Sequence, residues 1–154
     1  MAKRSAGILM YRGEVPGLEI LLVHPGGPFW AKKDTGAWSI PKGAYEADEN
    51  PLQAARREFA EELGTAPPQE GYLELGAPSQ SGRKTVVAFA VAGDFDPAAL
   101  KSNLFEMEWP PKSGQLKSFP EVDRARWFSL DDAYGKILPG QAPLIDRLLA
   151  RLAS

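Results

Sequence analysis

The pattern of apolar and polar residues predicts a strand hairpin at the start of the chain. The runs Ser5 to Tyr11 and Leu18 to His24 are short and apolar, as expected of strands. The second run is nearly continuous in apolar residues, which is typical of a strand buried on both faces. Gly13 to Gly17, with Pro16 inside it, indicates a turn. So short a link predicts that the two strands pair in antiparallel fashion.

The rest of the chain mixes helical and strand patterns. Further strands are predicted at Ala37 to Ile40, Tyr72 to Leu75, Lys84 to Ala92 and Ala125 to Ser129. Between Asp94 and Glu121 the chain is proline-rich and reads as irregular, with a short helical piece near Pro97 to Leu104. Leu130 to Ile137 predicts a helical turn, and Gln141 to Leu152 an amphipathic helix.

This order of elements predicts the fold class. Strands come first, then one helix, more strands and a closing helix, so strict alternation of strand and helix is absent. We therefore expect an α/β (α+β) fold with a mixed central β-sheet between helices. The chain has 154 residues without a repeat or linker, so a single domain over residues 1–154 is the simplest organisation.

Composition narrows the classes of function. The net charge is −2, whereas a general nucleic-acid binder usually carries a basic excess. The chain has no cysteines, which excludes thiolate sites, and a single histidine, His24, which excludes sites built from several histidines. A bound metal would need oxygen ligands, which suit Mg²⁺ or Mn²⁺. The apolar run from Ala6 to Tyr11 is too short for a signal segment, so we expect a soluble, cytoplasmic protein without membrane contact.

The segment of residues 50–63 has the strongest helix signals in the sequence. Asn50 suits the N-cap position, and Pro51 suits the first helical position, where its missing N–H costs nothing. Gln53 can close a capping box with Asn50, and Gly64 suits the position after the last helical residue. At about 100° per residue, the helix carries an apolar stripe that includes Phe59.

An acidic arc lies beside that stripe. Glu58, Glu61 and Glu62 share it with Arg57. Glu58 and Glu62 are a like-charge i,i+4 pair, and Glu61 and Glu62 lie near the helix C-terminus, the unfavourable end for anions. A solvated acidic face is the ordinary interpretation of such charges. The unfavourable placement of these charges favours a second interpretation, in which the carboxylates bind a divalent cation through their oxygen atoms.

These residues resemble the signature of the Nudix hydrolases. The match consists of Gly43, five residues, Glu49, seven residues and then Arg57-Glu58-Phe59-Ala60-Glu61-Glu62-Leu63-Gly64. Every charged and glycine position of the box, residues 43–65, agrees, and Thr65 departs from the aliphatic residue at the end. The resemblance implies an α/β/α sandwich and an enzyme that hydrolyses a nucleoside diphosphate linked to another group.

The resemblance also implies the roles of the box residues. Glu58 and Glu62 would be the main ligands of Mg²⁺, or of Mn²⁺ as a substitute, with the Gly43 carbonyl as another ligand. Glu61 would be a further ligand or the base that activates water. Arg57 would orient a glutamate, and Glu49 would tie the loop to the helix.

Many family members add an acidic ligand from outside the box. Glu121, six residues before Trp127, is the candidate here. An ordinary surface glutamate is an equally good interpretation of it, and Glu106 and Glu108 are weaker alternatives.

Substrate-binding residues are expected around the box. The sequence WSIPKG, Trp38 to Gly43, resembles a lead-in found in branches that act on dinucleoside polyphosphates, diphosphoinositol polyphosphates and oxidised nucleotides. Positive charge for phosphates would come from Lys42, Lys32, Lys33, Arg83 and Lys84. Phe29 and Trp30 are candidates to stack on a base. Trp38 is a candidate too, with a core position as the competing interpretation, and His24 is interpreted as structural.

Three functions remain open from the sequence. The first is hydrolysis of a dinucleoside polyphosphate such as diadenosine tetraphosphate, which the lead-in and the lysines favour. The second is removal of oxidised nucleoside triphosphates, and the third is a Nudix-fold binding module without catalysis. The intact carboxylates argue against the third. In the first two, the partner is a small nucleotide and not a nucleic acid or a membrane, and the protein is a monomer or a homodimer.

Overall fold

A mixed β-sheet runs through the centre of the molecule in this computed structural model, which describes residues 3–77 and 84–153. Within these residues the strands follow the order β4-β5-β1-β2-β8, and β3 pairs with β1. Their bounds are β1 Lys3–Arg12, β2 Glu19–Pro25, β3 Lys42–Ala44, β4 Leu73–Gly76, β5 Lys84–Ala92 and β8 Val122–Ser129. β1 and β5 are parallel, whereas the other neighbours are antiparallel. The predicted β1–β2 hairpin is confirmed by the pairing of Tyr11 with Ile20.

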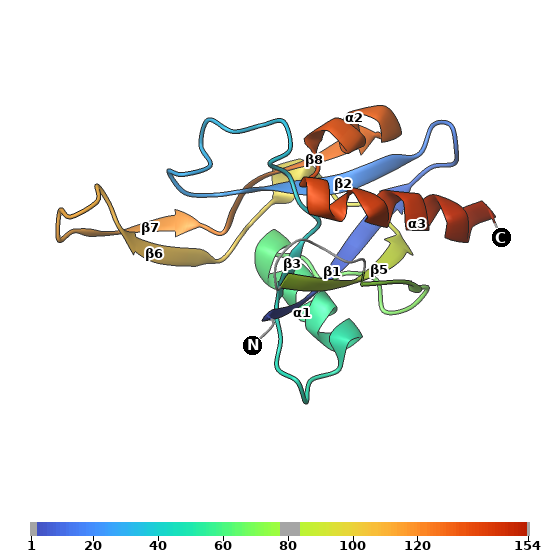
Figure 1. Cartoon of the computed structure of the whole chain (residues 1–154), viewed down its shortest axis with the longest axis horizontal. Helices are drawn as coiled ribbons and strands as arrows, with labels where there is room; N and C mark the ends of the chain where they lie inside the picture. Colours follow the sequence, from blue (N-terminus) through green and yellow to red (C-terminus); the bar gives the residue numbers. More distant parts are fainter. Residues whose placement is uncertain (1–2, 78–83, 154) are drawn as a thin grey trace.

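Helices cover both faces of the sheet (Figure 1). α1, Pro51–Leu63, packs on one face, and α2, Leu130–Lys136, and α3, Ala142–Ala153, lie on the other. Side chains alternate along β2, so that Leu21 joins the cluster under α1 while Ile20 and Leu22 join the cluster under α3. The predicted α/β sandwich with a mixed central sheet is therefore confirmed.

α1 begins and ends as its sequence predicts. The Asn50 side chain accepts a hydrogen bond from the Gln53 N–H, and Pro51 opens the helix. Gly64 has a φ of 78°, the left-handed conformation that favours glycine, and its N–H donates to the Ala60 carbonyl. Phe59 is buried against the sheet. Burial of this face of α1 against the sheet therefore determines the direction in which the glutamates beside Phe59 project.

The segment before the box differs from its prediction. A strand was expected at Ala37 to Ile40, but Trp38 and Ser39 make only isolated bridges, to Ile137 and Val23. The strand forms later, as β3, because Pro41 has no N–H to continue a ladder through this point. The Pro41 carbonyl instead accepts from the Ile8 N–H at 3.1 Å, which carries the chain onto β1.

The prediction of irregular chain between Asp94 and Glu121 is wrong. This region forms the hairpin β6, Leu104–Glu108, and β7, Leu116–Pro120, which projects from the body (Figure 1). The expected helical piece is only a short 3₁₀ turn, η1, Pro97–Ala99. Phe105 and Met107 do alternate with glutamates in β6, but five residues beside two prolines give a weak periodic signal.

The described helices include none that is long and apolar enough to cross a membrane.

The final helix keeps its predicted place, with α3 preceded by a short 3₁₀ turn, η2, Pro139–Gln141.

Candidate active site

A cleft of about 360 Å³ opens where the box meets the loop that follows β2. Its walls include Glu62 from α1, Lys42 from β3, Trp30 from the loop and Glu121 from the start of β8. A larger hollow of about 510 Å³ beside Trp127 contains none of the box residues. The smaller cleft is therefore the candidate site, because it combines carboxylates, a lysine and an aromatic side chain.

Glu62 lies partly buried in this cleft. Its Oε1 accepts a hydrogen bond from the Lys42 backbone N–H at 3.2 Å. Burial raises the pKa of Glu62 to about 8, and the charges of Glu58 and Glu121 act in the same direction, while the Lys42 N–H and charge oppose them. A carboxylate with this environment is stabilised in its charged form by a nearby cation.

Gly43 provides a cradle for Glu58. A Cβ added at Gly43 would lie 1.6 Å from Glu58 Oε1, which is impossible without displacing the carboxylate. Only a residue without a side chain lets Glu58 rest against the backbone of β3. Burial also raises the pKa of Glu58, with the Glu61 charge as a further cause and Arg57 opposing both.

Arg57 connects the box residues to one another. Its guanidinium forms an ion pair with Glu49 and donates to the Ala44 carbonyl at 3.2 Å. It also lies 3.3 Å from Glu58 Oε2 and 3.9 Å from Glu61 Oε1. These contacts hold the loop after β3 to α1 and restrict where the two carboxylates can point.

Backbone hydrogen bonds place Glu121 across the cleft from α1. The Glu61 carbonyl accepts from the Asn103 N–H at 3.0 Å, and the Asn103 carbonyl accepts from the Glu121 N–H at 2.9 Å. The Glu121 carbonyl in turn accepts from the Gly26 N–H at 2.9 Å. The two alternatives to Glu121 lie on the projecting hairpin. Glu108 there accepts from the Lys112 and Gly114 N–H groups, so its carboxylate stabilises the hairpin turn.

The predicted substrate residues fall into different places. Trp30 lines the cleft, and the Lys33 ammonium lies 5.0 Å from its ring centroid. Phe29 is 60% exposed and contacts Trp109 of the hairpin edge to face.

One substrate prediction changes with the structure, and another is not tested by it. Trp38 has 0% exposure and packs edge-on against Phe128 at 5.0 Å, so it belongs to the core and cannot offer a face to a base. This corrects its prediction as a substrate-binding residue. Arg83 lies outside the described residues.

The donor set fits a hard divalent cation in its chemistry. Glu58, Glu61, Glu62 and Glu121 offer oxygen only, and the absence of a side chain at Gly43 lets Glu58 approach the backbone of β3. Within the described part of the chain, no three acidic or histidine side chains converge into a finished metal cage. Glu58 and Glu61 both pair with Arg57, so an ion bound at these carboxylates would share them with the guanidinium.

Sequence reasoning missed Gln141. Its side chain is buried, accepts from the Ile40 N–H at 3.0 Å and donates to Ser39 Oγ at 3.0 Å. Ser39 and Ile40 line the cleft, so Gln141 fixes one of its walls. Nothing in the local sequence around Pro139 indicates this role, because the contact spans 101 residues.

Comparison with known proteins identifies the family. A model of the NUDIX domain family matches residues 1–148. The chain belongs to the Nudix family. An RNA pyrophosphohydrolase of Rhodospirillum rubrum is 29% identical over 159 aligned residues, which cover 97% of this chain and 91% of that protein.

Solved Nudix structures share the fold. The NUDIX domain of Shewanella oneidensis NrtR, complexed with ADP ribose, superposes with a TM-score of 0.65 at 19% identity. The alignment covers 99% of this chain and 89% of the NrtR chain. A C. elegans Ap4A hydrolase has a TM-score of 0.61 at 22% identity, with 98% of each chain covered. Family membership and the RNA pyrophosphohydrolase relatives identify this Nudix protein as a hydrolase of pyrophosphate bonds. Nudix enzymes generally use divalent metals.

Proposed function

We propose that this Nudix hydrolase cleaves a phosphoric anhydride bond in a dinucleoside polyphosphate such as diadenosine tetraphosphate, with Mg²⁺ as its cation. The observation that carries the proposal is the cleft in which Lys42 and Trp30 face the acidic residues Glu62 and Glu121. A polyphosphate chain needs positive charge along its oxygens, and a nucleoside needs an apolar or aromatic surface. The cleft offers both next to the box.

Each box residue has a proposed part in this reaction. Glu58, Glu62 and the Gly43 carbonyl, with Glu61 and Glu121, would hold the cation. When bound, the cation neutralises phosphate oxygens and orients the attacking water. Arg57 keeps Glu58 and Glu61 in reach by its ion pairs.

Proton transfer needs a base near the attacking water. Glu61 is the proposed base at its carboxylate, because its side chain is 45% exposed while that of Glu58 is 16% exposed. Lys42 would contact a phosphate oxygen, and Trp30 would stack on the base, with the Lys33 charge beside it. The neighbouring carboxylates would repel phosphate unless a cation stood between them.

A second candidate substrate is the 5′-triphosphate end of an RNA. The observation that favours it is the R. rubrum RNA pyrophosphohydrolase, which aligns with nearly the whole chain. Both candidates present a nucleoside 5′-polyphosphate to the cleft and differ in the group attached beyond it, a second nucleoside or an RNA chain. The net charge of −2 favours the small dinucleotide, since binding to an RNA body relies on basic surface.

A product assay separates the candidates. The protein is incubated with Mg²⁺ and, in turn, diadenosine tetraphosphate, 5′-triphosphorylated RNA, 8-oxo-dGTP and ordinary nucleoside triphosphates, all in ¹⁸O-labelled water. Cleavage of diadenosine tetraphosphate with the highest kcat/KM supports the first proposal, and label in one product identifies the attacked phosphorus. Preference for RNA would replace the first candidate by the second. Turnover of none of them would refute hydrolysis of these substrates.

A further inference from the structure

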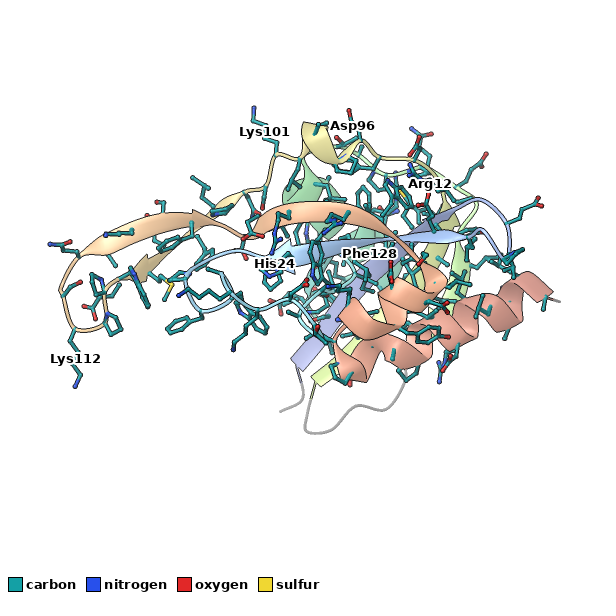
Figure 2. The ribbon with its side chains drawn as sticks, turned by 90° about the horizontal axis from the view of Figure 1, so that it is seen from above. Arg12, His24, Asp96, Lys101, Lys112 and Phe128 are labelled. Carbon is teal, nitrogen blue, oxygen red and sulfur yellow. The ribbon has the colours of Figure 1, made fainter. Side chains whose placement is uncertain are left out.

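His24 is a fully buried polar side chain that the proposed chemistry does not use. It is the residue before the last in β2 and has 0% exposure (labelled in Figure 2), and the Trp38 ring packs edge-on against it with 5.1 Å between the ring centroids. Its Nδ1 lies 2.8 Å from Asp123 Oδ1, and its Nε2 lies 2.7 Å from the Lys33 carbonyl oxygen. Both ring nitrogens therefore have a polar partner inside the fold.

These partners come from segments that lie far apart in the chain. The Lys33 carbonyl only accepts hydrogen bonds, so the ring nitrogen that faces it donates. Asp123 lies on β8, 99 residues along the chain from His24, and Lys33 lies in the loop after β2. One buried ring therefore connects that loop to β8.

The two contacts tie the cleft's aromatic loop to the segment that carries Glu121. The loop, residues 26–36, begins where the Gly26 N–H donates to the Glu121 carbonyl, and a Cβ at Gly26 would lie 1.9 Å from the Pro120 oxygen. Seven residues later the Lys33 carbonyl is held by His24, which is held by Asp123. Trp30 lies between these two anchors and lines the cleft.

Other charged groups surround this arrangement from each neighbouring element. Arg124 of β8 lies 3.8 Å from Asp123 Oδ1, and its guanidinium lies 5.1 Å from the Trp38 ring. Asp34, from the loop, accepts from the Trp38 indole N–H at 2.8 Å. Arg124 competes with His24 for Asp123, while Asp34 is engaged by Trp38 and Lys136. Asp123 is thus the carboxylate that faces the ring directly.

We propose that His24 is a positioning residue that holds Trp30 in the substrate cleft through the hydrogen bonds of its ring nitrogens with Asp123 and with the Lys33 carbonyl. This rests on the proposed function in one respect, namely that Trp30 contacts the nucleoside of a polyphosphate substrate. His24 acts through the loop and touches neither substrate nor cation. Its loss therefore weakens substrate binding and leaves the chemical step in place.

The hydrogen bond to Lys33 is tested without turnover. His24 is the one histidine in the sequence, so its imidazole ¹⁵N signals need no assignment. In the wild type, the Nε2 proton is expected to exchange slowly with water, because it is buried and bonded to the Lys33 carbonyl. A rapidly exchanging Nε2 proton would overturn the proposal.

Kinetics and hydrogen exchange test the positioning. His24→Gln has one amide in place of two opposed ring nitrogens and keeps only one of the two contacts, so the KM for diadenosine tetraphosphate is expected to rise about fivefold to tenfold, the size of one lost hydrogen bond. Its kcat is expected to stay within about twofold, since the box is intact. Amide exchange in residues 26–36 should become faster. An unchanged KM with unchanged loop exchange would refute the role.

Asp123→Asn keeps the test decisive if His24→Gln does not fold. It leaves the ring in place and changes only the partner of Nδ1, so Asp123→Ala, which removes that partner altogether, is measured beside it. In Asp123→Ala the KM should rise and amide exchange in residues 26–36 should become faster, with kcat within about twofold. An unchanged KM with unchanged loop exchange in Asp123→Ala would contradict the proposal. Asp131→Ala, at an exposed carboxylate on α2, removes the same charge elsewhere and should leave KM unchanged. If the wild type turns over no nucleotide, the proposed function fails, and the ring signals and loop exchange still decide the assignment of His24.

Discussion

Glu62 is the box carboxylate whose environment differs most clearly from water. Burial raises its pKa to about 8, and Glu58 and Glu121 add negative charge nearby. A carboxylate in such a position is suited to pairing with a cation bound in the cleft. Its role as a ligand remains a prediction, and a single substitution tests it.

Glu62→Gln is expected to lower kcat by roughly 10²–10³-fold, because a neutral amide cannot replace a charge that contributes several kcal/mol through the metal. The fold should persist, since the buried position disfavours the charged form in the first place. Steady-state kinetics at saturating Mg²⁺ and a melting curve measure both effects. A kcat equal to that of the wild type would remove Glu62 from the proposed cation site.

Gly43→Ala tests the cradle for Glu58. The new Cβ would lie 1.6 Å from Glu58 Oε1, but Glu58 is a flexible side chain that can rotate away. We expect kcat to fall at least about tenfold with a small change in melting temperature, because the carboxylate is displaced while the backbone is not. Gly17→Ala is the matched control, since its Cβ would meet only the Glu14 oxygen at an ordinary 3.5 Å. Full activity of Gly43→Ala would contradict the cradle.

At the scale of elements, the loop after β2 is held at its far end by α2. Asp34 forms an ion pair with Lys136 of α2 and accepts from the Trp38 indole N–H. These contacts, the Lys136 hydrogen bond first, hold the pKa of Asp34 below its ordinary value of 3.8. A lowered folded-state pKa means that Asp34 stabilises the fold above pH 3.8 and loses this effect as the pH falls through its folded pKa.

Asp34→Asn is therefore expected to lower the melting temperature slightly at neutral pH and to have less effect below about pH 3.8. The effect is small because the group is exposed to solvent and salt. Thermal melts of the variant and the wild type across acidic and neutral pH measure it. Glu14→Gln, an exposed carboxylate in the turn after β1, serves as the control. A difference that grows on acidification would contradict this sign.

At the scale of the whole molecule, cation binding should couple to stability. Ligands that bind only the folded state stabilise it by RT ln(1 + [L]/Kd), about 2.7 kcal/mol at a hundredfold excess over Kd. For a chain of this size, that corresponds to an increase of roughly 5–10 °C in melting temperature. We expect Mg²⁺ to produce such a shift in the wild type and a much smaller one in Glu62→Gln. A melting curve that ignores Mg²⁺ would argue against a carboxylate site.

Local patterns predicted much of this molecule correctly. The caps at Asn50 and Gly64 and the apolar stripe with Phe59 depend on residues within one helix, so their positions follow from sequence spacing. The spacing from Gly43 to Gly64 likewise indicated the family, because the cradle and the helix that carries Glu58 are close in the chain. The β6–β7 hairpin was missed because its strands are short, mixed in polarity and flanked by prolines.

The sequence by itself determined the helix, the positions of most strands along the chain, the family and the oxygen-only character of any cation site. Only the tertiary structure decided what stands opposite the box. It brought Trp30 and Glu121 to the same cleft as Glu62, moved Trp38 into the core, and placed Gln141 behind Ile40 and His24 between Lys33 and Asp123. The physical reason is distance along the chain. Contacts between segments up to about a hundred residues apart depend on the order and register of the strands in the sheet. Neither can be inferred from the chemistry of single residues.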